Sequence, residues 1–248
     1  PGKVRADLGK FRMSVGELNR WHPHALPETN YPLVYQAFLG EDGLAGTGVS
    51  LYTTLPVSIA KGTSEIFLQG AAVESEPLND GSLQPALLGR LQNFWQLSRS
   101  TYMEIGFTGV GAQNSDSGLT SNLLGADLRF TIRPPDAGTR KDITWRTEAY
   151  RLQRVGLDPT TTRYGMYSDL SWRFSRRWVV GARYDNVEAP YGPEDDNWRA
   201  TAVATWWQSE FVYLRLQAYR NHLESTGSLD NLTLQVVWAM GPHKHETY

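Results

Sequence analysis

Arginine dominates the side chains of this sequence that could bind a ligand. Five of its 24 basic residues are lysines, so 19 are arginines, and the formal net charge is −2. A guanidinium stays charged at any physiological pH and presents a planar fork of donors, which suits carboxylate and phosphate groups. A protein that coats nucleic acid usually carries a clear basic excess. We therefore expect no nucleic-acid partner, and arginines that contact acidic side chains or small anions.

The histidines include two pairs that could begin a metal site. His22 with His24, and His243 with His245, could each place two imidazoles on one side of an extended chain, as half of a zinc or nickel site. The spacing implies no third ligand, and the absence of cysteine excludes thiolate sites and thiol nucleophiles. We therefore expect structural or solvent-exposed histidines, no metal and no cofactor.

A remote catalytic alternative is an outer-membrane phospholipase-like hydrolase that uses His222 and Ser225. No oxyanion-hole pattern or orienting carboxamide accompanies this pair, since Asn221 is adjacent only in sequence. We therefore expect no enzyme and no catalytic residues.

Period-two alternation of apolar and polar residues recurs along the chain and predicts the elements that must position these side chains. From Tyr164 to Phe174 one face is apolar and aromatic, whereas the other carries Asp169 and Arg173. Twelve strands are expected, at 4–12, 47–55, 65–73, 86–97, 102–112, 122–133, 143–154, 164–174, 178–187, 198–207, 211–221 and 231–240.

Strand length and aromatic content favour a transmembrane β-barrel over a soluble β-sandwich, which would alternate as well. Strands of about 9–12 residues suit a tilted crossing of the hydrocarbon layer, whereas soluble sheets use about five or six residues. The sequence has nine Trp and twelve Tyr. Aromatic residues concentrate near the ends of the apolar faces, as an interfacial girdle requires: Tyr102, Trp145, Tyr164, Trp172, Phe174, Trp178, Trp198 and Trp206. We therefore predict an all-β fold, an antiparallel transmembrane meander β-barrel that forms a single domain over residues 1–248.

The connections between the expected strands differ in length, as in outer-membrane barrels with short turns at one end and long loops at the other. Ser98–Thr101, Ser175–Arg177 and Gln208–Glu210 are expected to be tight turns. Longer connections are expected at 13–46, 74–85, 155–163, 188–197 and 222–230.

The polar strand faces would line the interior of such a barrel, and two interpretations of their charges remain open. The arginines could lower the barrier for anions, or they could form a scaffold of ion pairs across neighbouring strands, such as Asp127 or Arg129 with Arg146 or Glu148. The expected pore-lining residues are Arg90, Arg129, Arg133, Arg146, Arg173, Arg183, Arg199, Arg215, Glu104, Asp127, Glu148, Asp169 and Asp185.

The connection at residues 13–46 is too long for a turn, and connections of this length tend to be functional. It mixes aromatic residues with three prolines, and its apolar side chains need a surface to pack on. We expect it to fold back into the lumen and narrow the pore. The candidate constriction charges are Glu17, Arg20, His22, His24, Glu28, Glu41 and Asp42.

The run from Leu8 to Leu51 resembles a segment of phosphate-selective porin O/P-like outer-membrane proteins, in the branch that carries an H-x-H-x-L-P element, here His22 to Pro27. The closing LQVVWAMGPHKHETY resembles the final strand of that branch. The resemblance implies a 16-stranded barrel with an inward constriction loop, passive diffusion of small solutes and a homotrimer. It also implies about four strands upstream of Pro1. Phosphate specificity is not expected, because the lysine clusters of the phosphate-selective members are absent.

Together these patterns predict a porin in the outer membrane of a Gram-negative-type bacterium, with outer-membrane lipid as its surroundings. Small hydrophilic, anionic solutes would diffuse through its arginine-rich lumen. The alternative is a non-conducting barrel that anchors or helps assemble a surface complex.

Overall fold

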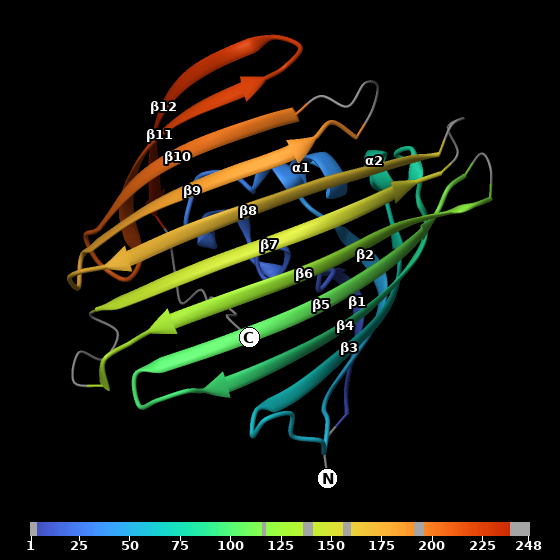
Figure 1. Cartoon of the computed structure of the whole chain (residues 1–248), viewed down its shortest axis with the longest axis horizontal. Helices are drawn as coiled ribbons and strands as arrows, with labels where there is room; N and C mark the ends of the chain where they lie inside the picture. The colour runs from blue at the N-terminus through green and yellow to red at the C-terminus, as the bar shows by residue number, and fades with distance from the viewer. Residues whose placement is uncertain (1–3, 116–117, 136–140, 156–159, 191–195, 239–248) are drawn as a thin grey trace.

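One antiparallel sheet of twelve strands makes up most of the computed structural model, which describes residues 4–115, 118–135, 141–155, 160–190 and 196–238. Each strand pairs with its neighbours in sequence (Figure 1), so the predicted all-β antiparallel meander is confirmed. The strands are β1 Arg5–Arg12, β2 Ala45–Thr54, β3 Thr63–Val73, β4 Gln84–Gln96, β5 Thr101–Gln113, β6 Thr120–Ile132, β7 Asp142–Arg154, β8 Thr161–Arg173, β9 Trp178–Glu188, β10 Asp196–Trp207, β11 Val212–Leu223 and β12 Gly227–Trp238.

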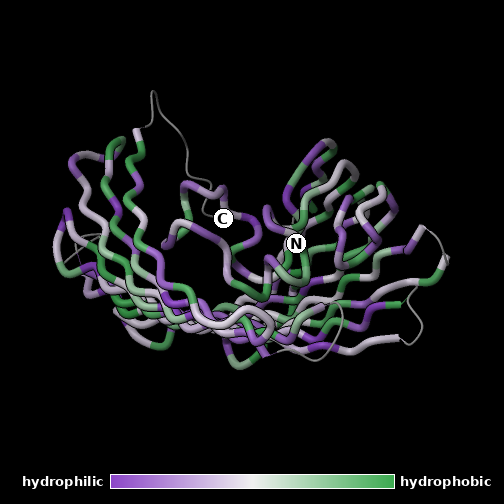
Figure 2. The backbone as a smooth tube through the Cα atoms, turned by 90° about the horizontal axis from the view of Figure 1, so that it is seen from above, coloured by the Kyte–Doolittle hydropathy of each residue, from purple (hydrophilic) through white to green (hydrophobic). Residues whose placement is uncertain are grey.

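The sheet is strongly curved, and Figure 2 shows it as a trough with a convex and a concave face. Along β5 the side chains alternate between the two faces, as the pleat of a strand requires. Phe107 on the convex face is 58% exposed, whereas Val110 on the concave face is 3% exposed. Leu87, Leu124 and Leu170 continue the exposed apolar surface on β4, β6 and β8.

Three connections at one end of the trough are the expected tight turns, because β4–β5, β8–β9 and β10–β11 are each joined by four residues. The expected long connection at 222–230 is wrong. β11 continues to Leu223 and β12 begins at Gly227, so three residues join them. Pairs such as His222 with Ser228 extend the ladder into the polar stretch that the sequence pattern assigned to a loop.

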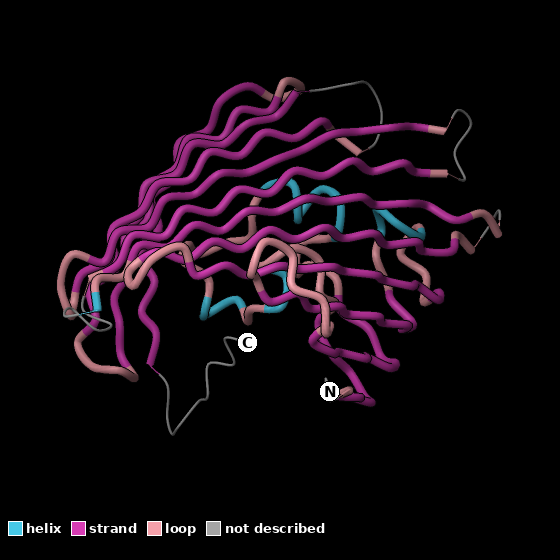
Figure 3. Tube along the Cα trace, turned by 60° about the horizontal axis from the view of Figure 1, so that its bottom comes forward, coloured by secondary structure: helices cyan, strands magenta, loops and turns pink. Residues whose placement is uncertain are grey.

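Residues 13–44, here called the inserted segment, connect β1 to β2 and lie in the hollow of the trough (Figure 3). The segment contains the short helices η1 (Leu18–Arg20), η2 (Pro23–Ala25) and α1 (Leu33–Leu39). Pro32 precedes α1, and Gly40 ends it with a φ of 109°, a conformation that favours glycine. A second short helix, α2 (Glu76–Asn79), follows β3 and packs on α1. Neither α-helix in the described residues has the length or hydropathy of a transmembrane segment.

The hydrophobic core lies between the inserted segment and part of the concave face. The segment contributes Met13, Leu18, Tyr35 and Phe38, whose side chains are at most 1% exposed. Burying each such side chain stabilises the fold by about 1.5–3 kcal/mol. The wall contributes inward-facing apolar residues from many strands: Val73, Leu88, Val110, Leu123, Leu152 and Val187.

The sheet has two open edges within the described residues. β1 pairs with β2 and β12 pairs with β11, but β1 and β12 do not pair with each other. Each edge therefore presents backbone N–H and C=O groups that another strand could bond.

Candidate functional site

Buried ion pairs cross the concave face between strands. Arg146 on β7 binds Asp169, its direct partner on β8, with a shortest distance of 2.8 Å. Arg90 on β4 reaches Asp127 on β6 at 2.6 and 2.8 Å, across the intervening strand β5. The position between them is Gly106, where a Cβ would lie 2.5 Å from both Arg90 and Asp127. Glycine at this position therefore lets the pair cross a strand.

The expected pairing of Asp127 or Arg129 with Arg146 or Glu148 does not form. The register of β6 and β7 sets Asp127 opposite Glu148 and Arg129 opposite Arg146, so like charges face each other. Directly opposed like charges destabilise a sheet, and each group instead turns to another partner. Arg129 lies 3.3 Å from Glu17 of the inserted segment and 3.6 Å from Glu104.

The carboxylate of Glu148 is held by a cluster of tyrosines and fastens the inserted segment to β7. The hydroxyls of Tyr35 and Tyr167 donate to it at 2.8 and 2.6 Å, and the hydroxyl of Tyr150 donates as well. The backbone N–H of Glu17 completes the set at 3.0 Å. Glu148 is 1% exposed, so these donors replace the water that an ionised carboxylate would otherwise need.

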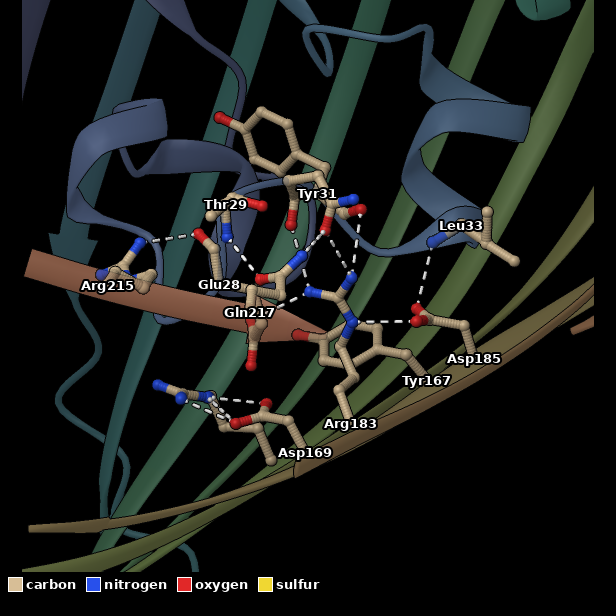
Figure 4. A network of polar contacts seen from close by, with 12 residues as sticks. Glu28, Thr29, Tyr31, Leu33, Tyr167, Asp169, Arg183, Asp185, Arg215 and Gln217 are labelled. Atoms are coloured by element: carbon tan, nitrogen blue, oxygen red, sulfur yellow. Dashed lines mark hydrogen bonds and ion pairs between the residues drawn. The ribbon is translucent and has the colours of Figure 1, made fainter. Parts of the chain in front are cut away.

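A second attachment centres on Arg183 of β9 (Figure 4). Its guanidinium binds Glu28 of the inserted segment at 2.8 Å and Asp185 of its own strand at 2.9 Å. Asp185 also accepts the backbone N–H of Leu33, the first residue of α1, at 3.0 Å. Glu28 and Arg183 therefore form a buried ion pair between the segment and the wall.

A third attachment lies on β11. Arg215 donates to the backbone carbonyl of Glu28 at 2.9 Å, and the side chain of Gln217 accepts the N–H of Thr29 at 2.8 Å (Figure 4). The inserted segment is thus bonded to β7 through Glu17 and Tyr35, and to β9 and β11 through residues between them.

Burial shifts the acidity of two groups in the inserted segment. It raises the pKa of the Glu28 carboxyl, an effect that the nearby Arg183 opposes. It also raises the pKa of the Tyr35 hydroxyl, with the charge of Glu148 acting in the same direction. Tyr35 therefore stays a hydrogen-bond donor to Glu148 across the physiological pH range.

A small and a large cavity lie beside the inserted segment. The small one, of about 70 Å³, lies between the segment and the wall and is lined by Glu17, Arg20, Trp21, Arg90, Gln92, Glu104, Asp127 and Arg129. An open one of about 1390 Å³ lies beside β1, β2 and β3. Arg20, Trp21 and Gln92 line both cavities.

The large cavity has an excess of basic side chains. Six basic and three acidic residues line it: Arg5, Lys10, Arg12, Arg20, Arg173, Arg215, Asp7, Asp42 and Glu65. Arg12, Arg20 and Arg215 form no ion pair within the part of the chain that the structure describes. The guanidinium groups of these three lie over the rings of Tyr31, Phe67 and Tyr213, with centroid distances of 5.5, 5.4 and 4.9 Å.

The other expected pore-lining arginines occupy different surroundings. Arg133 is exposed and lies 3.9 Å from Asp142, and Arg173 lies 3.7 Å from the same carboxylate. Arg199 is 7% exposed and stacks on Tyr219 at 4.8 Å.

The expected constriction residues do not lie together in the structure. Glu17 and Glu28 are buried against the wall, whereas His22 and His24 lie on the large cavity with their rings stacked at 5.6 Å. Asp42 lines the large cavity as well, and Glu41 is exposed. Among the described residues, no three His, Asp or Glu side chains converge as a metal site would require. His243 and His245 lie outside the described residues.

The remaining candidate, His222, hydrogen-bonds with Ser228 of β12 at 2.9 Å and stacks on Trp198. The ladder between β11 and β12 sets His222 directly opposite Ser228, so this pairing follows from strand register. Ser225, which the catalytic alternative requires, lies in the connecting turn.

Several residues that hold the inserted segment were missed by the sequence analysis. Tyr35, Tyr150 and Tyr167 surround Glu148, Gln69 accepts the N–H of Ser14 at 2.8 Å, and Asn19 bonds the backbone of Leu44. The detectable signal was the presence of tyrosine, leucine and valine on strand faces that otherwise read as polar.

Comparisons with known proteins place few limits on function. No family model matches the sequence, so the resemblance to phosphate-selective porins stays a prediction. A protein of Aquifex aeolicus (strain VF5), named only as uncharacterized, is 26% identical in an alignment over 218 residues that covers 75% of this chain and 45% of that protein. The chain thus spans a little under half the length of this relative. The solved structure of the KdgM porin in complex with disordered oligogalacturonate aligns with 78% of this chain and 94% of its own, at 11% identity and a TM-score of 0.35. A TM-score this low decides nothing about fold or function.

The contact between Gly16 and the tyrosine cluster generates one prediction. Gly16 has a φ of +53°, and a Cβ there would lie 1.9 Å from the Glu148 carboxylate. Gly118 has a φ of +65° but faces open space, so it is the matched control. Gly118→Ala should lower the free energy of unfolding by about 1–2 kcal/mol through backbone strain, and Gly16→Ala by about 1–3 kcal/mol more through overpacking. Denaturant titration measures both, and equal losses would contradict the tight contact.

Removing Arg183 should destabilise the protein strongly. Arg183→Met leaves Glu28 and Asp185 buried without their cation, which should lower the free energy of unfolding by about 3–5 kcal/mol. Limited trypsin digestion should also cut sooner after Arg20, because the segment loses its central attachment. Arg220→Met, which breaks an exposed pair with Asp230, is the control and should change little. A loss no larger than that of the control would show that the ionic contact is dispensable.

Proposed function

We propose that this chain forms most of the wall of a β-barrel channel in the outer membrane of a Gram-negative-type bacterium. Small hydrophilic solutes, with a preference for anions, diffuse through it passively. The observation that carries this proposal is the large cavity beside the inserted segment, which six basic and three acidic side chains line. A net positive wall lowers the barrier for anions.

The convex face supports the membrane location. Leucine and aromatic side chains remain exposed along it, including Leu124 and Phe107 in the middle part of β6 and β5. Trp145, Trp172 and Trp178 are exposed near the strand ends at the tight turns, where an interfacial girdle would lie. Strands of 13 residues, as in β4 to β8, are long enough to cross the hydrocarbon layer with a tilt.

The open edges at β1 and β12 support a barrel that further strands complete. Unpaired backbone groups cannot face lipid, because hydrocarbon offers them no hydrogen bond. We propose that strands outside residues 4–238 pair with both edges and close the wall around the cavity. A homotrimer of such barrels is part of the same proposal, since the family that the sequence resembles implies it.

A non-conducting barrel that anchors a surface complex is the second candidate. The concave face over β7, β8 and β9 is filled by the inserted segment, whose hydrogen bonds with Glu148 and Arg183 are buried. If the remaining strands cover the large cavity, the same bonds would make a stable plug. Single-channel recording separates the two candidates, because a plugged barrel inserts into bilayers without conducting.

The charge of the large cavity generates a prediction for selectivity. Replacing Arg12, Arg20 and Arg215 together by Gln should lower the anion-to-cation permeability ratio by about two- to fivefold, since three unpaired charges leave the wall. Reversal potentials of the purified full-length protein in planar bilayers under a salt gradient measure this ratio. Arg220→Gln, outside the cavity, is the control. An unchanged ratio in the triple variant would refute the anion preference.

The exposed convex face generates a prediction for insertion. Phe107→Arg places a charge at the middle of β5, and should destabilise the folded protein in phospholipid vesicles by about 2–4 kcal/mol. Gln113→Arg places the same charge at the end of the same strand, on the same face, and should cost about 0–1 kcal/mol. If both substitutions cost the same in vesicles, the convex face is not buried in lipid.

A further inference from the structure

Arg20 and two aromatic rings form a compact group at the boundary between the two cavities. Arg20 ends η1, and its guanidinium lies over the ring of Phe67 on β3 at 5.4 Å. The ring of Phe67 contacts that of Tyr52 on β2 at 4.8 Å, and both line the large cavity. Here we call Arg20, Phe67 and Tyr52 the arginine ledge.

Arg20 carries a charge that the described residues do not neutralise directly. Its Nε is buried without a hydrogen-bond partner, and its guanidinium is in no ion pair within the described residues. Burial and the charge of Arg90 lower the pKa of Arg20, while Glu17 and Glu104 act in the opposite direction. An added anion beside Arg20 would therefore be stabilised, because a guanidinium binds carboxylate strongly through charge-assisted hydrogen bonds.

The surroundings of Arg20 favour an organic over an inorganic anion. Phe11, Trp21 and Trp207 line the large cavity together with the two rings of the ledge. A small hydrated anion gains nothing from these rings, whereas a flat apolar body stacks on them.

We propose that the arginine ledge is a binding subsite for aromatic monocarboxylates on the path of the solute. The carboxylate takes the free N–H groups of Arg20, and the ring packs against Phe67, Tyr52 and Trp21. This inference rests on the proposed function, because it names the class of solute that the channel prefers. The subsite itself depends on residues of the described chain alone.

Binding in the absence of a membrane tests the proposal. The purified full-length protein, folded in detergent micelles, is titrated calorimetrically with benzoate, with acetate and with benzyl alcohol. Acetate keeps the charge without the ring, and benzyl alcohol keeps the ring without the charge. Benzoate should bind at least about tenfold more tightly than either, since only benzoate uses both the guanidinium and the rings.

Variants assign the two contributions. Arg20→Gln should weaken benzoate binding by about tenfold or more, because a charge-assisted bond is lost. Phe67→Leu should weaken it by about threefold through loss of stacking. Arg220→Gln, the matched charge control on an exposed position, should leave it unchanged. Circular dichroism confirms that each variant is folded, and Arg20→Lys replaces Arg20→Gln if the latter does not fold.

Equal affinity for benzoate and acetate would overturn the proposal, as would an Arg20 variant that binds like the Arg220 control. The measurement needs no ion flow, so its failure is separable from that of the proposed function. Benzoate binding without conductance would refute the channel and leave the subsite. Conductance without a preference for benzoate would refute the subsite and leave the channel.

Discussion

A carboxylate or guanidinium buried inside a protein needs a charged or hydrogen-bonding partner, and the concave face of this sheet depends on that constraint. The wall carries Glu148, Arg183 and Asp185 at positions that the inserted segment covers. Each of them is bonded to that segment, through Tyr35, Glu28 and the N–H of Leu33. These hydrogen bonds and ion pairs therefore fix the position of the inserted segment on the wall. The apolar core adds stability, but apolar contacts are less specific about the position of the segment.

The same constraint decides which charges are available to a solute. Arg90, Arg146 and Arg183 are held by Asp127, Asp169 and Asp185, so their positive charge is balanced within the wall. Of the arginines that line the large cavity, Arg12, Arg20 and Arg215 form no ion pair with a described residue, and two of them, Arg12 and Arg20, adjoin or belong to the inserted segment. Selectivity, as proposed, would then be set more by the segment than by the barrel wall.

The strands could be predicted because alternation is a local property. A side chain on a strand faces one side of the sheet or the other, so apolar and polar residues at period two reveal both the strand and its faces. The ends of the strands were less predictable, because polar residues are found both in loops and in strand ladders. His222 and Ser228, for example, are polar but pair in the ladder between β11 and β12. The alternation assigned Arg90, Arg146 and Arg183 to the polar strand faces, but it did not identify their partners. Strand register sets Arg129 opposite Arg146, and that register depends on every neighbouring pair along the two strands.

By itself the sequence determined the fold class, the alternation of apolar and polar residues along the strands and the presence of a long segment between the first two strands. These follow from short-range pattern, because the pleat of a strand and the length of a connection are local. Only the tertiary structure decided that Tyr35, Tyr150 and Tyr167 surround Glu148, that Gly106 lets Arg90 reach Asp127, and that Arg20 forms no ion pair with a described residue. Tyr35 and Glu148, like Arg90 and Asp127, are far apart in sequence, so their contacts depend on the curvature of the sheet, its register and the path of the inserted segment.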